Sequence, residues 1–497
     1  MKKVLWISIL AATLILFCSM PQKGVSQQPP DKVTQLAKKV HLNFKTLVFD
    51  QKIAMANAIQ QQKDFLLEQP EVQEVTRLKG SNLFVKFKDG NELLMFLGRD
   101  KLGSESEASE EYPVHQVQTQ KKQFQQLKKI QKPELVRPLL PCAPNSHKAL
   151  IFDCLEDDNN VITPKICQQV RSNLQALGYS VTVRLNDNAN LANAALIDNG
   201  EYGVVFMRGH GGDLGGDFGF LVRPWYTNFP PANSGYTGTI RASAYNNASE
   251  ETQFGYVITG NFSSTYWINQ SFPSTVFFLE SCHGADPGAL PGMPTWTINH
   301  GAAVWLGWNE SVSFGCGDNG SKLFFDRIGD QENVGAAVAA VFATGCRPPE
   351  LVTHPAGKDS CRLTLWRSDP NETTAPDSRD FSRLKLVSGM TGLFVTVTFF
   401  ASPNFDEFFF YVDTGGTSAA EILIRCHSTN FEAFTQTSPG LYNTKIFTGT
   451  ASTNGNDYFL ILPWNTIFGT IGSVKVWFYD MSGKDRLPDS GSVMVKK

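Results

Sequence analysis

The sequence has little charge and, after its first twenty residues, no long apolar run. Charged residues make up 18% of the 497 residues and the formal net charge is -3, which argues against a basic nucleic-acid-binding surface and against an acidic solvating tail. No later segment is long and apolar enough to span a membrane. The apolar fraction of 42% is that of a folded protein, and 497 residues are too many for one ordinary hydrophobic core, so two or three domains are predicted.

The N-terminus, MKKVLWISILAATLILFCSM, has the layout of a secretory signal peptide. Lys2 and Lys3 precede an uncharged run that ends at Phe17, and this run is too short to span a membrane comfortably. Cleavage is predicted after Ser26, which makes residues 1–26 the signal peptide. Lipid attachment at Cys18 is the alternative, but Phe17 is bulky where a lipobox has a small residue. We expect a secreted, periplasmic or cell-surface protein without a membrane span after signal removal.

Nine cysteines in an exported chain predict disulfide bonds. Removal of Cys18 leaves eight, and a nucleophile among them would leave seven, so at least one further thiol must be free. The connectivity cannot be deduced from the spacing. Cys346 with Cys361, which flank a proline-rich loop, is one candidate pair.

The first part of the chain reads as a small α+β pro-segment followed by a linker. Residues 27–100 hold a helical stretch around residues 49–69 and then a hairpin whose turn contains Lys88, Asp89 and Gly90. Residues 101–145 are polar and rich in Gln and Lys, which is typical of an exposed linker. A protease that selects Lys or Arg could cut itself in this linker.

Residues 146–370 are predicted to form an α/β domain with a mostly parallel sheet flanked by helices. The apolar runs KALIFDC, YSVTVRL and YGVVFMR alternate with helical patterns, and strands that alternate with helices indicate parallel pairing. A segment rich in Gly, Asn, Ser and Tyr is inserted before TVFFLES resumes the sheet. Residues 371–497 contain only short β-type runs, which predicts a β-sandwich.

Two apolar strands are each followed by a residue with catalytic chemistry. EYGVVFMRGHGG leads to His210, and STVFFLESCHGA leads to Cys282. Functional groups of an open α/β sheet gather at the carboxyl ends of its strands. If the two strands are neighbours, the imidazole and the thiol lie at the same edge, which is the arrangement of a cysteine nucleophile with its acid/base partner. A structural histidine in a glycine-rich turn is the alternative for His210 alone.

The neighbouring residues have roles under this interpretation. Gly211 could bring its backbone N–H close to the developing oxyanion, with the N–H of Cys282 as the second donor. Glu280 precedes Cys282 by two residues and so projects from the same face of the strand, where its carboxylate could bind a basic substrate side chain. Asp153, Glu310 and Asp318 are further candidates for the substrate pocket. His283 adjoins the nucleophile and is expected to be a loop residue.

These strings resemble the caspase-type (clan CD) cysteine peptidases, which include metacaspases, legumains, gingipains and clostripain. The resemblance rests on FMRGHGG and FFLESCHGA and covers roughly residues 146–345. It implies His210 as the general acid/base, Cys282 as the nucleophile and Gly211 as an oxyanion donor. ESCHG is closest to the metacaspase form, in which an aspartate at the position of Glu280 helps to form the pocket for the residue before the scissile bond. Arg or Lys is then the implied preference, although legumains, which prefer Asn, are similar at this position.

The rest of the chain adds expectations about ligands. The C-terminal strings FFFYVDTGG, DYFLILPW and GKDRLPDSG resemble carbohydrate-binding or DOMON-type sandwiches. This resemblance by itself does not identify a ligand, and a surface glycan or protein is the candidate partner. No metal site is predicted, and peptide hydrolysis by a thiol needs no cofactor. Calcium at the acidic loop CLEDDNN, residues 154–160, is an alternative to a solvated loop.

The sequence therefore predicts an exported cysteine endopeptidase, made as a zymogen, that acts on a protein or peptide substrate without nucleic acid. The alternative is a non-catalytic surface-binding or adhesion protein, in which the peptidase-like domain is a scaffold and the sandwich binds the ligand.

Overall fold

The computed structural model describes residues 32–78, 82–97, 142–155, 166–214, 216–230, 234–236, 238–246, 251–268, 272–343, 349–368, 381–389, 391–399, 408–414, 421–438, 441–469, 471–480, 486–487 and 492–497. The predicted signal peptide with Cys18, almost all of the predicted linker, most of the acidic loop and Cys346 lie outside these residues. Within the described part of the chain, none of the helices is long and apolar enough to cross a membrane.

A six-stranded sheet forms the centre of the molecule. Its order is β13-β12-β11-β6-β4-β5, and all neighbours are parallel except β12 and β13. The mixed α/β architecture predicted from the alternating strands and helices is confirmed. The strands are β4 (Lys148–Asp153), β5 (Ser180–Leu185), β6 (Val204–Arg208), β11 (Val276–Glu280), β12 (Val304–Trp308) and β13 (Leu351–His354).

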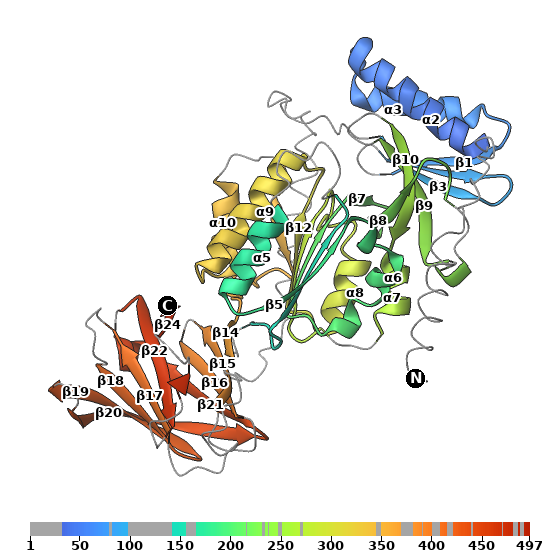
Figure 1. Cartoon of the computed structure of the whole chain (residues 1–497). Helices are drawn as coiled ribbons and strands as arrows, with labels where there is room; N and C mark the ends of the chain where they lie inside the picture. Colours follow the sequence, from blue (N-terminus) through green and yellow to red (C-terminus); the bar gives the residue numbers. More distant parts are fainter. Residues whose placement is uncertain are drawn as a thin grey trace, which may run out of the picture.

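Helices cover both faces of this sheet (Figure 1). One face carries α5 (Ile166–Ala176), α9 (Phe314–Gly329) and α10 (Val334–Phe342), and the other carries α6 (Leu191–Ala195), α7 (Gly260–Tyr266) and α8 (Met293–Asn299). Strand β4 shows why apolar runs suit this position: Ala149 and Ile151 pack into one hydrophobic core, and Leu150 and Phe152 pack into the other. A strand buried on both faces needs apolar residues throughout.

The N-terminal segment and the inserted segment share a second sheet, with the order β1-β2-β3-β9-β10-β8-β7. The parallel pair β3–β9 joins the two segments. This joining was not predicted, because the two segments were interpreted separately. The elements are α2 (Lys32–Lys45), η1 (Thr46–Asp50), α3 (Met55–Leu67), β1 (Val72–Arg77), β2 (Asn82–Phe87), β3 (Glu92–Phe96), β7 (Gly211–Asp213), β8 (Phe218–Tyr226), β9 (Ile240–Asn246) and β10 (Thr252–Ile258).

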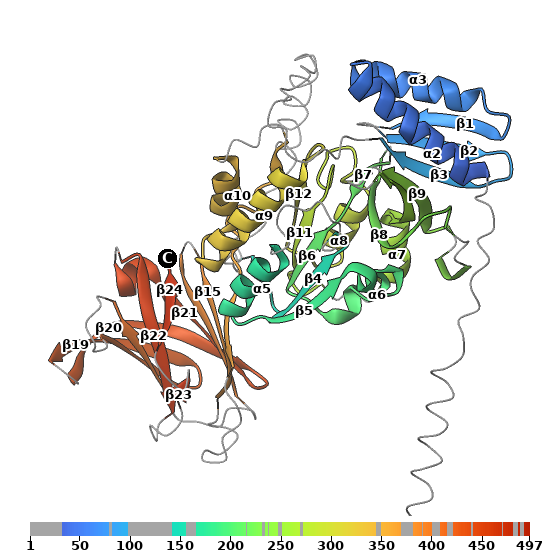
Figure 2. The same cartoon turned by 45° about the horizontal axis from the view of Figure 1, so that its top comes forward.

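The described C-terminal part consists of β-strands and one short helical element, η5 (Trp464–Phe468), and lies on the far side of the central sheet from the N-terminal segment (Figures 1 and 2). The long strand β20 pairs with β19 in one sheet and with β21 in another. Phe381 and Phe399 contact Phe408 across the two sheets, with ring centroids 6.0 and 5.8 Å apart, so the sheets pack face to face. The strands are β14 (Leu365–Ser368), β15 (Phe381–Ser388), β16 (Gly392–Phe399), β17 (Phe408–Asp413), β18 (Ile422–Cys426), β19 (Asn430–Ser438), β20 (Leu441–Asn454), β21 (Asp457–Pro463), β22 (Ser473–Asp480), β23 (Arg486–Leu487) and β24 (Val493–Lys496).

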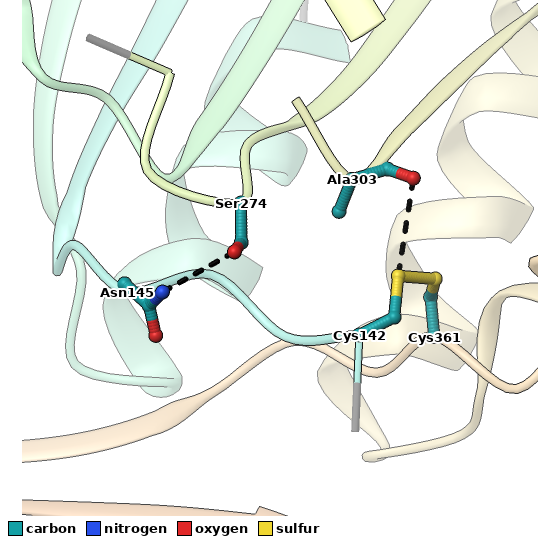
Figure 3. The surroundings of a disulfide bond; sticks show 5 residues. All are labelled: Cys142, Asn145, Ser274, Ala303 and Cys361. Carbon is teal, nitrogen blue, oxygen red and sulfur yellow. Dashed lines mark hydrogen bonds between the residues drawn. A yellow bond between two sulfur atoms is a disulfide. The ribbon is translucent and has the colours of Figure 1, made fainter. Parts of the chain in front are cut away.

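A disulfide bond joins Cys142 to Cys361 (Figure 3). The candidate pair Cys346–Cys361 is therefore wrong. The bond links the start of the α/β region to the segment that precedes β14, across 219 residues, a separation that no local spacing reveals. Cys316 is also disulfide-bonded. Four described cysteines remain as thiols: Cys154, Cys167, Cys282 and Cys426.

Candidate active site

The register of two central strands places the predicted catalytic pair at one edge of the sheet. Strands β6 and β11 are parallel neighbours, and Arg208 pairs with Glu280 at their carboxyl ends. The N–H of Gly209 donates to the Glu280 carbonyl at 3.1 Å, so the two chains stay side by side beyond the strands. His210 and Cys282 each follow that last pair by two residues. Both therefore leave the sheet at the same edge and at the same level.

Gly211 is at a position where only glycine fits. A Cβ at this residue would overlap the Oγ of Ser281 and would lie 2.9 Å from the carbonyl oxygen of Gly219. The chain that follows His210 is thus packed directly against the residue that precedes Cys282. This close approach joins the two chains just beyond the sheet edge, and the role of Gly211 as an oxyanion donor stays a prediction.

Cys282 is the only partly exposed thiol among the four described free cysteines. Its Sγ lies against the loop after β12: the N–H of Val312 donates to Sγ at 3.4 Å, and Sγ lies 3.5 Å from the Val312 carbonyl oxygen. A backbone N–H directed at sulfur stabilises the thiolate, which is the reactive form of cysteine. Val312 was not predicted as part of the site, because it follows a different strand.

His210 is partly exposed and lies between two aromatic rings. Its ring centroid is 4.7 Å from that of Tyr245 on β9 and 5.4 Å from that of Phe314 at the start of α9. Its Nε2 is buried and has no hydrogen-bond partner within the described residues. Burial, with a smaller contribution from the charge of Arg208, lowers the pKa of His210 from 6.5 to about 4. The imidazole is therefore neutral at neutral pH and able to accept a proton.

A buried charge cluster lies at the same edge, around Arg208 of β6. The guanidinium is fully buried, and its Nη1 donates to both oxygens of Asp153 at 3.2 and 3.0 Å. Its Nε lies 3.0 Å from Oε1 of Glu280 and 2.9 Å from Oδ1 of Asp318. One positive charge thus holds three buried carboxylates. Burial raises the pKa of Glu280, as does the neighbouring Asp318, well above its ordinary value although Arg208 opposes the shift.

This cluster changes the interpretation of the predicted substrate pocket. Asp153, Glu280 and Asp318 were expected to face a substrate, but each is at most 4% exposed and contacts Arg208 of the same chain. The physical reason is that Arg208 and Glu280 have the same spacing from the catalytic residues on adjacent strands, so both side chains enter one space. Glu310 is partly exposed in the loop after β12, where its carbonyl accepts from the N–H of His283 at 3.0 Å.

The described residues contain no group of three or more His, Cys, Asp or Glu side chains that could hold a metal ion. The acidic loop in which calcium was considered lies largely outside them, so calcium binding stays a prediction. His283 occupies the turn after β11, as expected of a loop residue, although its side chain is buried.

No protein-family model matches the chain, and no curated protein sequence matches it. Six chains of solved structures match, and two of them are described here. One is the complex of the Porphyromonas gingivalis RgpB pro- and mature domains, with a TM-score of 0.28 and 8% identity over 70% of this chain and 68% of that chain. The other is the Arg-specific cysteine proteinase gingipain R, with a TM-score of 0.27 and 9% identity over 70% of this chain and 67% of that chain. These values are too low to assign a fold or an activity.

Proposed function

We propose that the protein is an exported cysteine endopeptidase with Cys282 as its nucleophile and His210 as its general acid/base. One observation carries the proposal: the parallel neighbours β6 and β11 end in register, and His210 and Cys282 follow their ends at the same edge of the sheet. The packing of Gly211 against Ser281 supports it. A panel of fluorogenic peptides, cleaved by the wild-type chain and by Cys282→Ala, tests it.

The proposed reaction passes through a thioester. The Cys282 thiol gives its proton to His210, and the sulfur attacks the carbonyl carbon of the scissile peptide bond. The N–H groups of Gly211 and Cys282 hold the oxyanion. The C–N bond then breaks, and the leaving amine takes the proton from His210. Water, deprotonated by the neutral imidazole, hydrolyses the thioester and restores the thiol. No cofactor enters these steps.

The buried charge cluster bears on substrate preference. A pocket for Arg or Lys needs an unpaired carboxylate, but Glu280 and its two neighbours already bind Arg208. We therefore propose that the enzyme favours neutral residues before the scissile bond, with Asn among them, over the basic preference implied by the sequence resemblance. Peptide pairs that differ only in Arg or citrulline at this position distinguish a neutral from a basic preference. A strong preference for Arg would contradict the proposal, because it would show that substrate can reach a carboxylate.

The lowered pKa of His210 predicts activity that persists into the acid range. Because the pKa is about 4, the imidazole stays a neutral base well below pH 6.5, and kcat/KM should fall only as the pH approaches 4. The unfolded chain protonates this histidine near pH 6.5, so folded-state stability should fall as the pH drops from 6.5 towards 4. NMR titration of the His210 ring, identified with His210→Gln, measures the pKa directly. A midpoint near 6.5 would contradict the prediction.

The N-terminal segment lies beside the proposed site and supports a zymogen. Asn82 of β2 and Phe96 of β3 pack against Gly212, so closely that a Cβ there would lie 2.6 and 3.0 Å from them. Phe96 also pairs with Tyr245 of β9, the residue whose ring lies next to His210. We propose that this segment restricts access to the site until the linker is cut and the segment leaves.

Cleavage in the linker, residues 101–145, by an added protease is expected to raise peptidase activity by about tenfold or more, because a tethered segment competes with substrate at a millimolar effective concentration. Phe96→Ala should raise the activity of the uncut chain in part, since it weakens the contact with Gly212. Leu42→Ala is the control, because Leu42 is 65% exposed in the same segment. Equal activity of cut and uncut chains would rule out the zymogen.

A second candidate function is ligand binding by the C-terminal β region. The rings of Tyr411 and Trp477, on the adjacent strands β17 and β22, are stacked with centroids 5.9 Å apart and planes 7° apart. Tyr479 and Tyr442 contact the same tyrosine, and all four side chains are partly exposed. Aromatic faces of this kind stack on apolar ring surfaces, so a surface glycan is the proposed ligand, either as a docking site for the enzyme or as the main function of a non-catalytic protein.

A further inference from the structure

Three side chains beside Cys282, none of them used in the proposed peptidase, form a hydrogen-bonded row. The Nδ1 of His283 lies 3.0 Å from Oδ2 of Asp286, and its Nε2 lies 3.0 Å from Oγ of Ser311. A carboxylate only accepts hydrogen bonds, so Nδ1 donates to Asp286, and in the tautomer with its single proton on Nδ1 the Nε2 accepts from the serine hydroxyl. The Ser311 hydroxyl then donates to the His283 imidazole, and the imidazole donates to the Asp286 carboxylate.

The burial of the row increases from one end to the other. Ser311 is exposed, His283 is 4% exposed and Asp286 is fully buried. The second oxygen of Asp286 accepts from the N–H of Gly288 at 2.9 Å, which fixes the carboxylate. A nucleophile that meets solvent and a base that is oriented from within are what nucleophilic catalysis by serine requires.

The backbone around His283 is held in an unusual conformation. Its φ is 57°, which is uncommon for a residue other than glycine and costs on the order of 1 kcal/mol or more. Its N–H donates to the carbonyl of Glu310, the residue before Ser311, at 3.0 Å. The turn after β11 and the loop after β12 are therefore tied together where the imidazole meets the hydroxyl.

We propose that Ser311, His283 and Asp286 form a second nucleophilic site, of serine type, which takes acyl esters. This site is separate from the Cys282–His210 pair, because its base is bound to its own carboxylate and hydroxyl, and it does not depend on the proposed peptidase. Ser311 is exposed, so small activated esters are the substrate class that can reach its hydroxyl.

The chemistry at this site balances without a cofactor. Ser311 Oγ bonds to the acyl carbon while its proton passes to Nε2 of His283, and Asp286 stabilises the imidazolium. The bond to the alkoxy group breaks, and the departing alcohol takes the proton. Water then attacks the acyl-serine with His283 as base, which releases a carboxylic acid and restores the hydroxyl.

The start of α9 supplies donors for the oxyanion of this reaction. The helix begins at Phe314, three residues after Ser311, and is 16 residues long. The first N–H groups of a helix have no intrahelical partner and carry the positive end of its dipole, so they favour negative charge. Gly315 in this turn has open space where a Cβ would lie, so an acyl group can approach.

The test uses a fluorophosphonate probe on the full-length chain carrying Cys282→Ala. Phosphonylation forms a bond between Oγ and phosphorus and releases fluoride, while His283 accepts the serine proton. We expect one labelled peptide, which contains Ser311, and no labelling of Ser311→Ala. Asp286→Asn should lower the labelling rate by about a hundredfold or more, because the carboxylate no longer orients and stabilises the base.

Ser313→Asn is the matched control, since it removes the nearest other hydroxyl of the loop but keeps a side-chain oxygen for the N-cap that Ser313 provides to α9. Its labelling rate should equal that of the parent. If Asp286→Asn does not fold, the labelling of Ser311→Ala and that of Ser313→Asn still show whether Ser311 is the residue that reacts with the probe. Absence of label at Ser311 in the folded chain, or a rate unchanged by Asp286→Asn, would overturn the proposal and leave the row as a structural tie.

Discussion

Cys282→Ala is expected to lower kcat/KM for peptide substrates by about ten-thousand-fold or more, because removal of the nucleophile from a covalent mechanism leaves only binding and oxyanion stabilisation. The fold should not change, since the thiol is partly exposed and its contacts are to the backbone of Val312. An electrophilic peptide probe provides a second measurement. It should label the wild-type chain at Cys282 and leave the variant unlabelled.

A matched control for this loss is Cys426→Ala. Cys426 lies in β18, is fully buried, and burial raises its pKa, so it does not form a thiolate in the working range. Its removal should leave peptide cleavage unchanged. His210→Gln should reduce kcat/KM by about a hundredfold or more, as expected of a lost general acid/base.

The opposite outcome identifies the second candidate function. If the chain cut in its linker cleaves no peptide of the panel and Cys282 does not react with the probe, the peptidase proposal fails. The C-terminal aromatic face around Tyr411 and Trp477 then becomes the part of the chain with the better claim to function. Labelling of Ser311 is measured in the Cys282→Ala chain, so its result does not depend on whether Cys282 is the nucleophile of a peptidase.

Much of the central sheet could be predicted because its strands are buried on both faces. Runs such as VVFMR and VFFLE have few interpretations other than interior parallel strands, and their carboxyl ends locate His210 and Cys282. The N-terminal helix α2 had an equally clear pattern, with Val33, Leu36, Ala37 and Val40 on one buried face. It was missed because the sequence analysis considered only the helical stretch that follows it.

Other features depend on contacts between residues far apart in the chain. An arginine at the end of the apolar run VVFMR is unusual, and it could have indicated a buried charge. Its three carboxylate partners could not be predicted, because they come from three other elements. The β3–β9 pairing joins segments separated by the linker and by the first three strands of the central sheet, β4, β5 and β6. The Cys142–Cys361 bond spans 219 residues. Spacing rules describe neighbours along a helix or strand, so they are silent about such contacts.

Arg208→Met is expected to lower the free energy of unfolding of the α/β region by about 3–5 kcal/mol, because it leaves buried carboxylates without their cation. Arg208 is fully buried and contacts all three carboxylates. Urea denaturation followed by tryptophan fluorescence measures the change. Arg327→Met is the control: Arg327 is 45% exposed in its pair with Glu332, and an exposed pair contributes at most about 1 kcal/mol.

The pH dependence of this variant separates charge from packing. Glu280 already has a raised pKa in the folded chain, and loss of Arg208 raises it further because the charge that opposed the shift is gone. A raised folded-state pKa means that the unfolded chain releases its proton first, so stability is greatest below the unfolded value near 4.5 and is lost as the pH rises. Arg208→Met should therefore be closest to wild type in mild acid. Adding Glu280→Gln should recover stability at neutral pH, since an amide carries no charge to bury. If the deficit is the same at every pH, the cluster acts through packing, and Glu280 becomes available again as a candidate for the substrate pocket.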